Sequence, residues 1–111
     1  MADSVELLHG ARYATPEDAQ FAYDTFSARA KARGYVVGIT GSTLFGEGQD
    51  VDLIVVSSVD ATDSAAQVAN EFISNASHVY FYEEDENGSS AAAVFLQNGI
   101  VIDAYFYGLE R

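Results

Sequence analysis

The sequence has no cysteine, a single lysine and only one proline. Without cysteine, disulfides and thiolate metal sites are excluded, and this fits a cytoplasmic protein. The sequence contains no run of 18 apolar residues, the length at which a helix could span a bilayer. Residues 1–10 also lack the basic and long apolar segments of a secretory signal. We therefore expect a cytoplasmic protein with no membrane segment.

Positive charge is scarce. Five Lys and Arg residues stand against 17 Asp and Glu residues, which gives a net charge of −12. Nucleic-acid binding depends on cationic contacts to phosphates, so direct binding to DNA or RNA is not expected. Attraction to anionic lipid is disfavoured for the same reason. Three explanations of the charge stay open: metal binding, a basic protein partner, or a surface that is acidic for solubility or salt adaptation.

The length and hydrophobicity fit one domain. With 111 residues, of which 49% are hydrophobic, the chain can build one core and is too short for two. We therefore expect residues 1–111 to form a single domain, with residues 1–14 as a flexible or accessory segment. A first helix is predicted to begin at Pro16, behind Thr15 as N-cap, and to end at Gly34.

Further periodicities predict the other elements. Residues 35–39 and 51–56 are rich in β-branched residues and indicate strands, the second apolar on both faces and therefore internal. Thr62 and Asp63 offer the cap of a second helix, whose apolar stripe is Ala65, Val68, Ala69, Phe72 and Ala76.

The last third of the chain has the period of strands. Residues 78–83, 91–97 and 100–107 alternate, and Asn98-Gly99 is a strong signal for a hairpin turn between the last two. The order of elements predicts an α/β (α+β) fold: a small mixed sheet of about five strands with two main helices packed on one face.

Three aspartates interrupt these apolar strands. Asp50 and Asp52 are two residues apart, so in a strand they project from the same face. Asp103 lies on the face opposite Ile102 and Ala104. If the two strands are neighbours, the three carboxylates converge on the helix-free face, where they would repel one another unless a cation sits between them. Such oxygen ligands suit Mg²⁺ or Mn²⁺, with nucleotide phosphates completing the coordination.

A glycine turn precedes the aspartate pair. Turns such as Gly41-Ser42 can present backbone N–H groups and a hydroxyl to phosphates. Together, this turn, the Asp50-Val51-Asp52 strand opening and the later Asp103 resemble the DNA polymerase β-type nucleotidyltransferase superfamily. The resemblance spans roughly residues 15–107 and is greatest to the minimal members, which are often paired with HEPN partners as antitoxins.

The resemblance implies a nucleotidyltransferase-like fold and a site. Gly41 and Ser42 would hold the triphosphate, Asp50 and Asp52 would ligate two divalent ions, and Asp103 would complete the metal site and help activate the attacking hydroxyl. The implied reaction transfers a nucleotidyl group, AMP in the minimal members, from an NTP such as ATP to a hydroxyl of a protein or small molecule. Since the chain has no room for the helical substrate domain of larger relatives, a homodimer or a separate helical partner is expected to complete the acceptor site.

The sequence also departs from that family. Only seven residues separate Ser42 from Asp50, fewer than is usual, and Leu44 and Phe45 stand where a basic residue is often found. A second interpretation therefore stays open: a non-catalytic acidic binding module, such as a phage-type inhibitor that occupies the basic nucleic-acid channel of a defence protein. A regulatory domain that binds nucleotide without transferring it is a third.

Individual residues have simpler interpretations as well. Aspartate is common where strands begin, and an aspartate on an open sheet face is often merely solvated. Four tyrosines fall on strand faces opposite their neighbouring apolar residues: Tyr80, Tyr82, Tyr105 and Tyr107. Packing is their expected role, with contact to a base or to a partner as the alternative.

Overall fold

The computed structural model describes residues 11–41, 43, 45–59, 61, 63–74, 76, 79–83 and 89–108. The predictions made for residues 1–10, Ser42 and Thr62 lie outside these residues.

Helix α2 (Pro16–Ala32) forms as its sequence signals predict. Thr15 is the N-cap, its hydroxyl accepts from the Asp18 backbone N–H at 3.2 Å, and the Asp18 carboxylate accepts from the Thr15 backbone N–H at 2.9 Å. This reciprocal pair satisfies two of the backbone donors that a helix leaves free at its start. The chain leaves the helix through Gly34, whose φ of 80° is readily adopted only by glycine.

Helix α3 (Ala65–Ile73) corrects the predicted cap. Ser64 is the N-cap, in a capping box with Gln67, and not Thr62 or Asp63. The Asp63 carboxylate instead accepts a hydrogen bond from Arg33 at 2.9 Å, which ties the start of α3 to the end of α2. The predicted stripe also extended too far, because Ala76 lies beyond the last helical residue, although it still packs against the core.

The five strands form one mixed sheet in the order β1-β2-β5-β4-β3. Their bounds are β1 (Tyr35–Thr40), β2 (Asp50–Ser57), β3 (Val79–Glu83), β4 (Ser90–Gln97) and β5 (Ile100–Tyr107). Strand β2 runs parallel to β5, and every other neighbouring pair is antiparallel. The prediction that β2 is internal is confirmed, while β5 occupies the centre.

The turn between β4 and β5 is the predicted hairpin. Asn98 has φ 55° and Gly99 has φ 79°, so both residues are in the left-handed region. Two consecutive left-handed residues match the twist of the flanking strands, which explains why Asn-Gly suits this position. The hairpin pairs Gln97 with Ile100 and thereby sets the register of β4 against β5.

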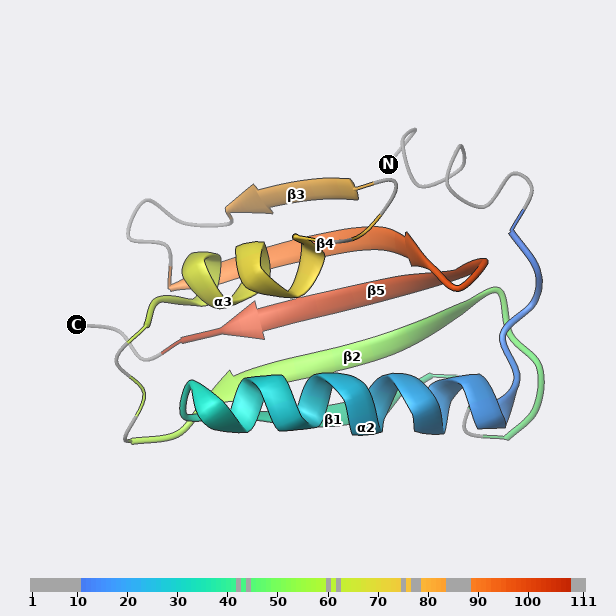
Figure 1. The fold of residues 1–111 in the computed structure, drawn as a ribbon, viewed down its shortest axis with the longest axis horizontal. Coiled ribbons are helices and arrows are strands. Elements are labelled where there is room, and N and C mark those ends of the chain that lie inside the picture. The colour runs from blue at the N-terminus through green and yellow to red at the C-terminus, as the bar shows by residue number, and fades with distance from the viewer. Residues whose placement is uncertain are drawn as a thin grey trace.

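Both helices cover one face of the sheet (Figure 1). Between the helices and the sheet, Phe26 stacks on Phe72 with ring centroids 4.9 Å apart, and these rings meet Phe95 and Phe106 edge-on. All four phenylalanines are at most 3% exposed. The predicted arrangement, a mixed sheet with two helices on one face, is confirmed. Neither described helix is long and apolar enough to cross a membrane.

The segment before α2 is fixed against the loop that leads into β2. Ala14 is fully buried and pairs with Gly48 through two backbone hydrogen bonds of 2.8 and 2.9 Å. Arg12 forms an ion pair with Asp18 at 2.7 Å and donates its backbone N–H to the Gly99 carbonyl. Residues 11–14 therefore help to position the chain immediately before Asp50.

Candidate metal centre

The three predicted aspartates come together on two neighbouring strands. Asp50 and Asp52 lie at the start of β2, and Asp103 lies in the middle of β5. The parallel register places Asp52 directly beside Asp103. One carboxylate oxygen from each residue lies within 4.8 Å of those from the other two. Asp103 lies 53 positions after Asp50 and 51 after Asp52 in the sequence, so residues far apart in the chain form one acidic cluster.

The alternation of each strand decides which way the carboxylates face. Val51 and Leu53 on β2, with Ile102 and Ala104 on β5, are all at most 2% exposed and belong to the core under the helices. The intervening aspartates must therefore point to the opposite face. They are half-buried there, on the side of the sheet that no described helix covers.

Burial and mutual repulsion make it unfavourable for all three carboxylates to be ionised. Burial raises the pKa of Asp50, and burial together with the charge of Asp50 raises the pKa of Asp52. The pKa of Asp103 rises to about 6, first through burial and then through the charges of Asp52 and Asp50. A cation placed among them would relieve both effects.

No cationic side chain of the described residues supplies that charge. Arg12 is paired with Asp18, and Arg33 is paired with Asp63 and Glu71. Three half-buried carboxylates with no described counter-charge, and with oxygens spaced to share an ion, match the donor set that hard divalent cations prefer. The cluster therefore fits Mg²⁺ or Mn²⁺, and Asp50, Asp52 and Asp103 are the residues that would hold it.

Gly41 lies against the cluster, at the end of β1. Its φ of 95° is a conformation that residues with a side chain rarely adopt, and a Cβ at this position would overlap the Asp52 carboxylate. The backbone of Gly41 therefore passes close to Asp52, while the expected contact of this turn with phosphates stays a prediction. The other half of the predicted phosphate turn, Ser42, lies outside the described residues.

Two further residues near the cluster were not singled out by the sequence as site residues. Tyr105 follows Asp103 on the same face, and the charge of Asp103 is the main cause of the raised pKa of its phenol. Thr43, two residues after Gly41, is fully buried, and its hydroxyl has no hydrogen-bond partner among the described residues. The strand alternation carried a signal for Tyr105, whereas no sequence signal marks Thr43 as buried.

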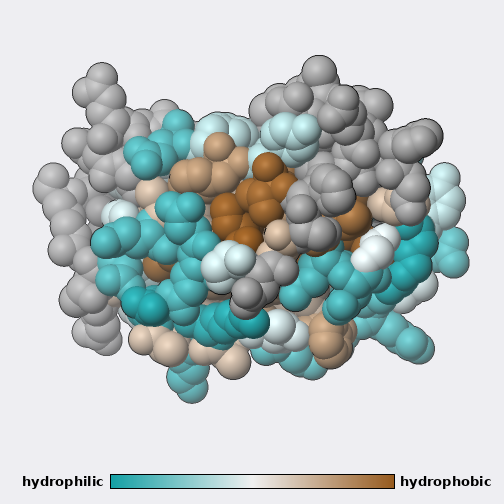
Figure 2. Space-filling model, turned by 45° about the horizontal axis from the view of Figure 1, so that its top comes forward, coloured by the Kyte–Doolittle hydropathy of each residue, from teal (hydrophilic) through white to brown (hydrophobic). Residues whose placement is uncertain are grey.

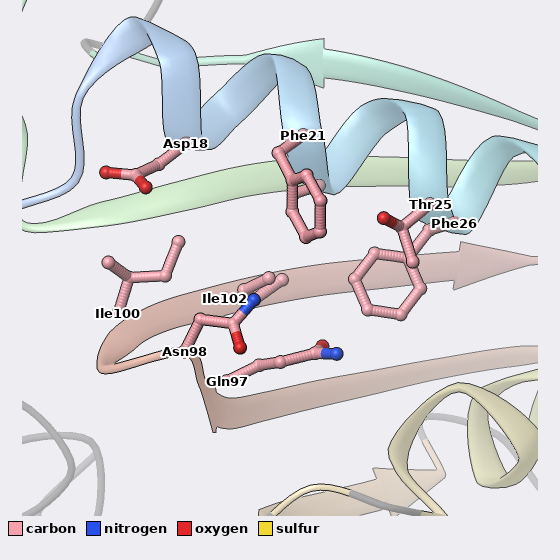
Figure 3. A pocket seen from close by; sticks show the side chains of 9 residues that line it. Asp18, Phe21, Thr25, Phe26, Gln97, Asn98, Ile100 and Ile102 are labelled. Carbon is pink, nitrogen blue, oxygen red and sulfur yellow. The ribbon is translucent and has the colours of Figure 1, made fainter.

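A separate groove lies on the helix-covered side of the sheet, between α2 and the β4–β5 hairpin (Figure 3). It has an empty volume of about 280 Å³, and Phe21 and Phe26 of α2 face Ile100 and Ile102 of β5 across it. None of the three aspartates lines it. On the face of the molecule that Figure 2 shows, hydrophilic residues surround a hydrophobic area near the middle of the view.

Comparison with known proteins supports the fold. No protein-family model and no curated protein matches the sequence. Among solved structures, the chain is similar to polymerase beta of Leishmania infantum, crystallised as a ternary P/T complex, with a TM-score of 0.60 and 10% sequence identity. The similarity covers 98% of this chain and 48% of the polymerase chain, so this chain spans about half the length of that protein. At this identity the likeness shows the fold alone, and that fold is polymerase β-like, as predicted.

Proposed function

We propose that this chain transfers a nucleotidyl group, AMP, from an NTP to a hydroxyl of a protein or small molecule, with Mg²⁺ or Mn²⁺ bound. The observation that carries the proposal is the cluster of Asp50, Asp52 and Asp103, whose carboxylate oxygens lie within 4.8 Å of one another on a polymerase β-like fold. A divalent ion held there would polarise the phosphoryl group and lower the pKa of a hydroxyl beside it.

The residues of the chain divide the work in the proposed reaction. Asp50 and Asp52 on β2, together with Asp103 on β5, are the residues that would hold the divalent ions. The acceptor oxygen bonds to the α-phosphorus while the bond from that phosphorus to the bridging oxygen of pyrophosphate breaks. Asp103 would accept the hydroxyl proton as a carboxylate, the form that a cation bound beside it favours. Gly41, whose backbone passes against Asp52 because it has no side chain, would offer its backbone N–H to the triphosphate.

The surroundings of the cluster favour an acceptor that is not a nucleic acid. The chain carries a net charge of −12, and no described basic side chain pairs with the cluster. A polyanionic acceptor would meet repulsion from this surface. The choice of AMP and the antitoxin-like role rest on the resemblance to the minimal nucleotidyltransferases.

We also propose that a second protein surface completes the acceptor site. The described fold has two helices, both on the face opposite the aspartates. On the face with the aspartates, Ala11 packs against the buried Val94 and Val101, but no described helix covers the cluster. A homodimer or a separate helical partner would supply that cover. Light scattering coupled to chromatography tests the homodimer directly, and a lone monomer that is inactive with every added partner would count against both.

The test of the proposed reaction is thermal shift with Mg²⁺, with and without ATP, together with pyrophosphate release. Wild type should be stabilised by metal and further by nucleotide, and the double variant Asp50→Asn with Asp52→Asn should lose both responses. Asp24→Asn, on the exposed outer surface of α2, is the matched control for removing negative charge. Equal responses of the double variant and the wild type would remove the aspartate cluster from the proposal.

The second candidate is a non-catalytic acidic module that binds a basic protein. The scarcity of cations favours it, because a triphosphate would find no described basic side chain at the cluster. This candidate predicts no metal response and tight, salt-sensitive binding to a basic protein. A regulatory domain would instead show stabilisation by nucleotide and metal without pyrophosphate release.

A further inference from the structure

The open face of the sheet carries more than the aspartates. Farther along the strands, two cross-strand rows of uncharged side chains span the same face. In one row Val36, Val56 and Tyr107 are direct neighbours on β1, β2 and β5. In the next row Ile54 is paired with Tyr105, and Tyr82 reaches this row through Ala92. We call these two rows the apolar rows.

These side chains are unusually exposed for their type. Val36 is 64% exposed, Val56 and Tyr107 are each 43% exposed, and Tyr82 and Ile54 are 37% and 36% exposed. None of the residues in the rows is charged, although the chain contains 17 acidic residues. A contiguous apolar surface of this kind on a folded protein marks an interaction site more often than scattered apolar residues do.

The shape and charge of this surface select the class of ligand. The rows lie on the broad face of a sheet that is about 19 Å wide across its five strands, whereas small molecules bind in concave pockets. Nucleic acids and anionic membranes are repelled by the net charge of −12. A protein is the remaining class, and long-range attraction favours one of positive charge.

A second copy of this chain fits less well than a cationic partner. From the exposed fractions, the five exposed side chains present roughly 400 Å², about half of what each partner contributes to an interface of standard size. The contact must therefore extend beyond the rows, and along β2 and β5 it next meets Asp52 and Asp103. A second copy brings the same acidic residues and another net charge of −12, while lysine or arginine side chains would complement them.

We infer that the apolar rows are a docking surface for a protein partner that combines an apolar face with basic residues beside it. The inference concerns the surface next to the aspartates and does not require them to be catalytic.

The test uses three 18-residue probe peptides and the intact chain. The first carries leucines on one helical face and lysines on the other, the second is a scrambled version of equal composition, and the third replaces lysine by glutamate. Backbone amide shifts should locate the first peptide on β1, β2 and β5, with an affinity at least ten-fold higher than that of the other two. Circular dichroism should show that each protein variant used in the following comparison is folded.

Three substitutions to aspartate, two within the apolar rows and one outside them as the control, separate docking from general charge attraction. Val56→Asp should lower the affinity for the leucine-lysine peptide at least ten-fold, even though it makes the chain more negative. Val36→Asp should lower this affinity as well. Gln20→Asp adds the same charge on the exposed surface of α2 and should not weaken binding. If Val56→Asp and Gln20→Asp behave alike, or if the scrambled peptide binds equally well, the docking surface is refuted.

Sedimentation velocity decides between a partner and a second copy. A dimer that Val56→Asp dissociates would overturn the choice of a cationic partner. The thermal-shift response to Mg²⁺ and ATP, measured on the same samples, keeps the two proposals apart. Peptide docking without a metal response would support the docking surface and refute the proposed function. A metal response without peptide docking would support the proposed function and refute the docking surface.

Discussion

Replacing Asp103 by asparagine should stabilise the metal-free protein at neutral pH. Burial and the neighbouring carboxylates raise the pKa of Asp103 to about 6 from its ordinary value of 3.8. The folded state therefore binds the Asp103 proton more tightly than the unfolded state does, and stability falls as the pH rises from about 4 to about 6. Asparagine is nearly the same size and cannot ionise, so the variant should not show this fall.

The size of the effect follows from the pKa difference. A shift of about two pKa units corresponds to about 3 kcal/mol, and because the side chain is half exposed we discount this to about 1–2 kcal/mol. For a domain of this size, that gain would raise the melting temperature by about 4–9 °C. Thermal unfolding at pH 7.5 in the presence of EDTA measures it, and at pH 4 the variant and the wild type should unfold at nearly the same temperature.

Adding a divalent cation should reverse the order of stability, so that wild type becomes more stable than Asp103→Asn. Mg²⁺ or Mn²⁺ at about 100 times its dissociation constant would stabilise wild type by about 2.7 kcal/mol and should stabilise Asp103→Asn far less. Asp24→Asn removes one charge from the exposed surface of α2 and shows how much of any gain comes from lowering the net charge alone. The electrostatic account of the cluster is refuted if Asp103→Asn is no more stable than Asp24→Asn without metal at pH 7.5.

Three further substitutions test other parts of the structure. Gly41→Ala should destabilise the fold by about 1–3 kcal/mol and weaken the response to Mg²⁺, since the φ of 95° and the contact with Asp52 both exclude a side chain. Gly46→Ala is the control, because a Cβ there meets no atom within 4 Å. Its free energy of unfolding, measured by chemical denaturation, should change by under about 0.5 kcal/mol. Thr43→Val keeps the shape of a fully buried side chain and removes a hydroxyl that has no described partner. The free energy of unfolding measured in urea should therefore be unchanged or higher by about 1 kcal/mol. A clear loss of stability would show that the hydroxyl has a partner. Asp18→Asn should lower stability by about 1 kcal/mol at pH 7, because hydrogen bonds from Arg12 and then from the Thr15 backbone hold the pKa of Asp18 below its usual range. The stability difference from wild type should shrink as the pH falls below about 4. A difference that does not depend on pH would contradict this cause.

Local sequence signals were sufficient for most of the fold. The Thr15-Pro16 start predicted α2, and Asn98-Gly99 predicted the hairpin, because both depend on conformational preferences within a few residues. The cap of α3 was misplaced because Thr62, Asp63 and Ser64 are all good caps, and the choice depends on Gln67 pairing with Ser64 while Arg33 engages Asp63. That choice involves a contact between residues 30 positions apart.

The sequence by itself determined the face of the sheet to which each aspartate points. Alternation in a strand has a period of two, so buried Val51, Leu53, Ile102 and Ala104 leave the opposite face to Asp50, Asp52 and Asp103. Only the tertiary structure decided that β2 and β5 are parallel neighbours with Asp52 beside Asp103, and that Gly41 lies against Asp52. Strand order and register depend on how the whole sheet packs beneath α2 and α3, and no short stretch of the chain contains that information.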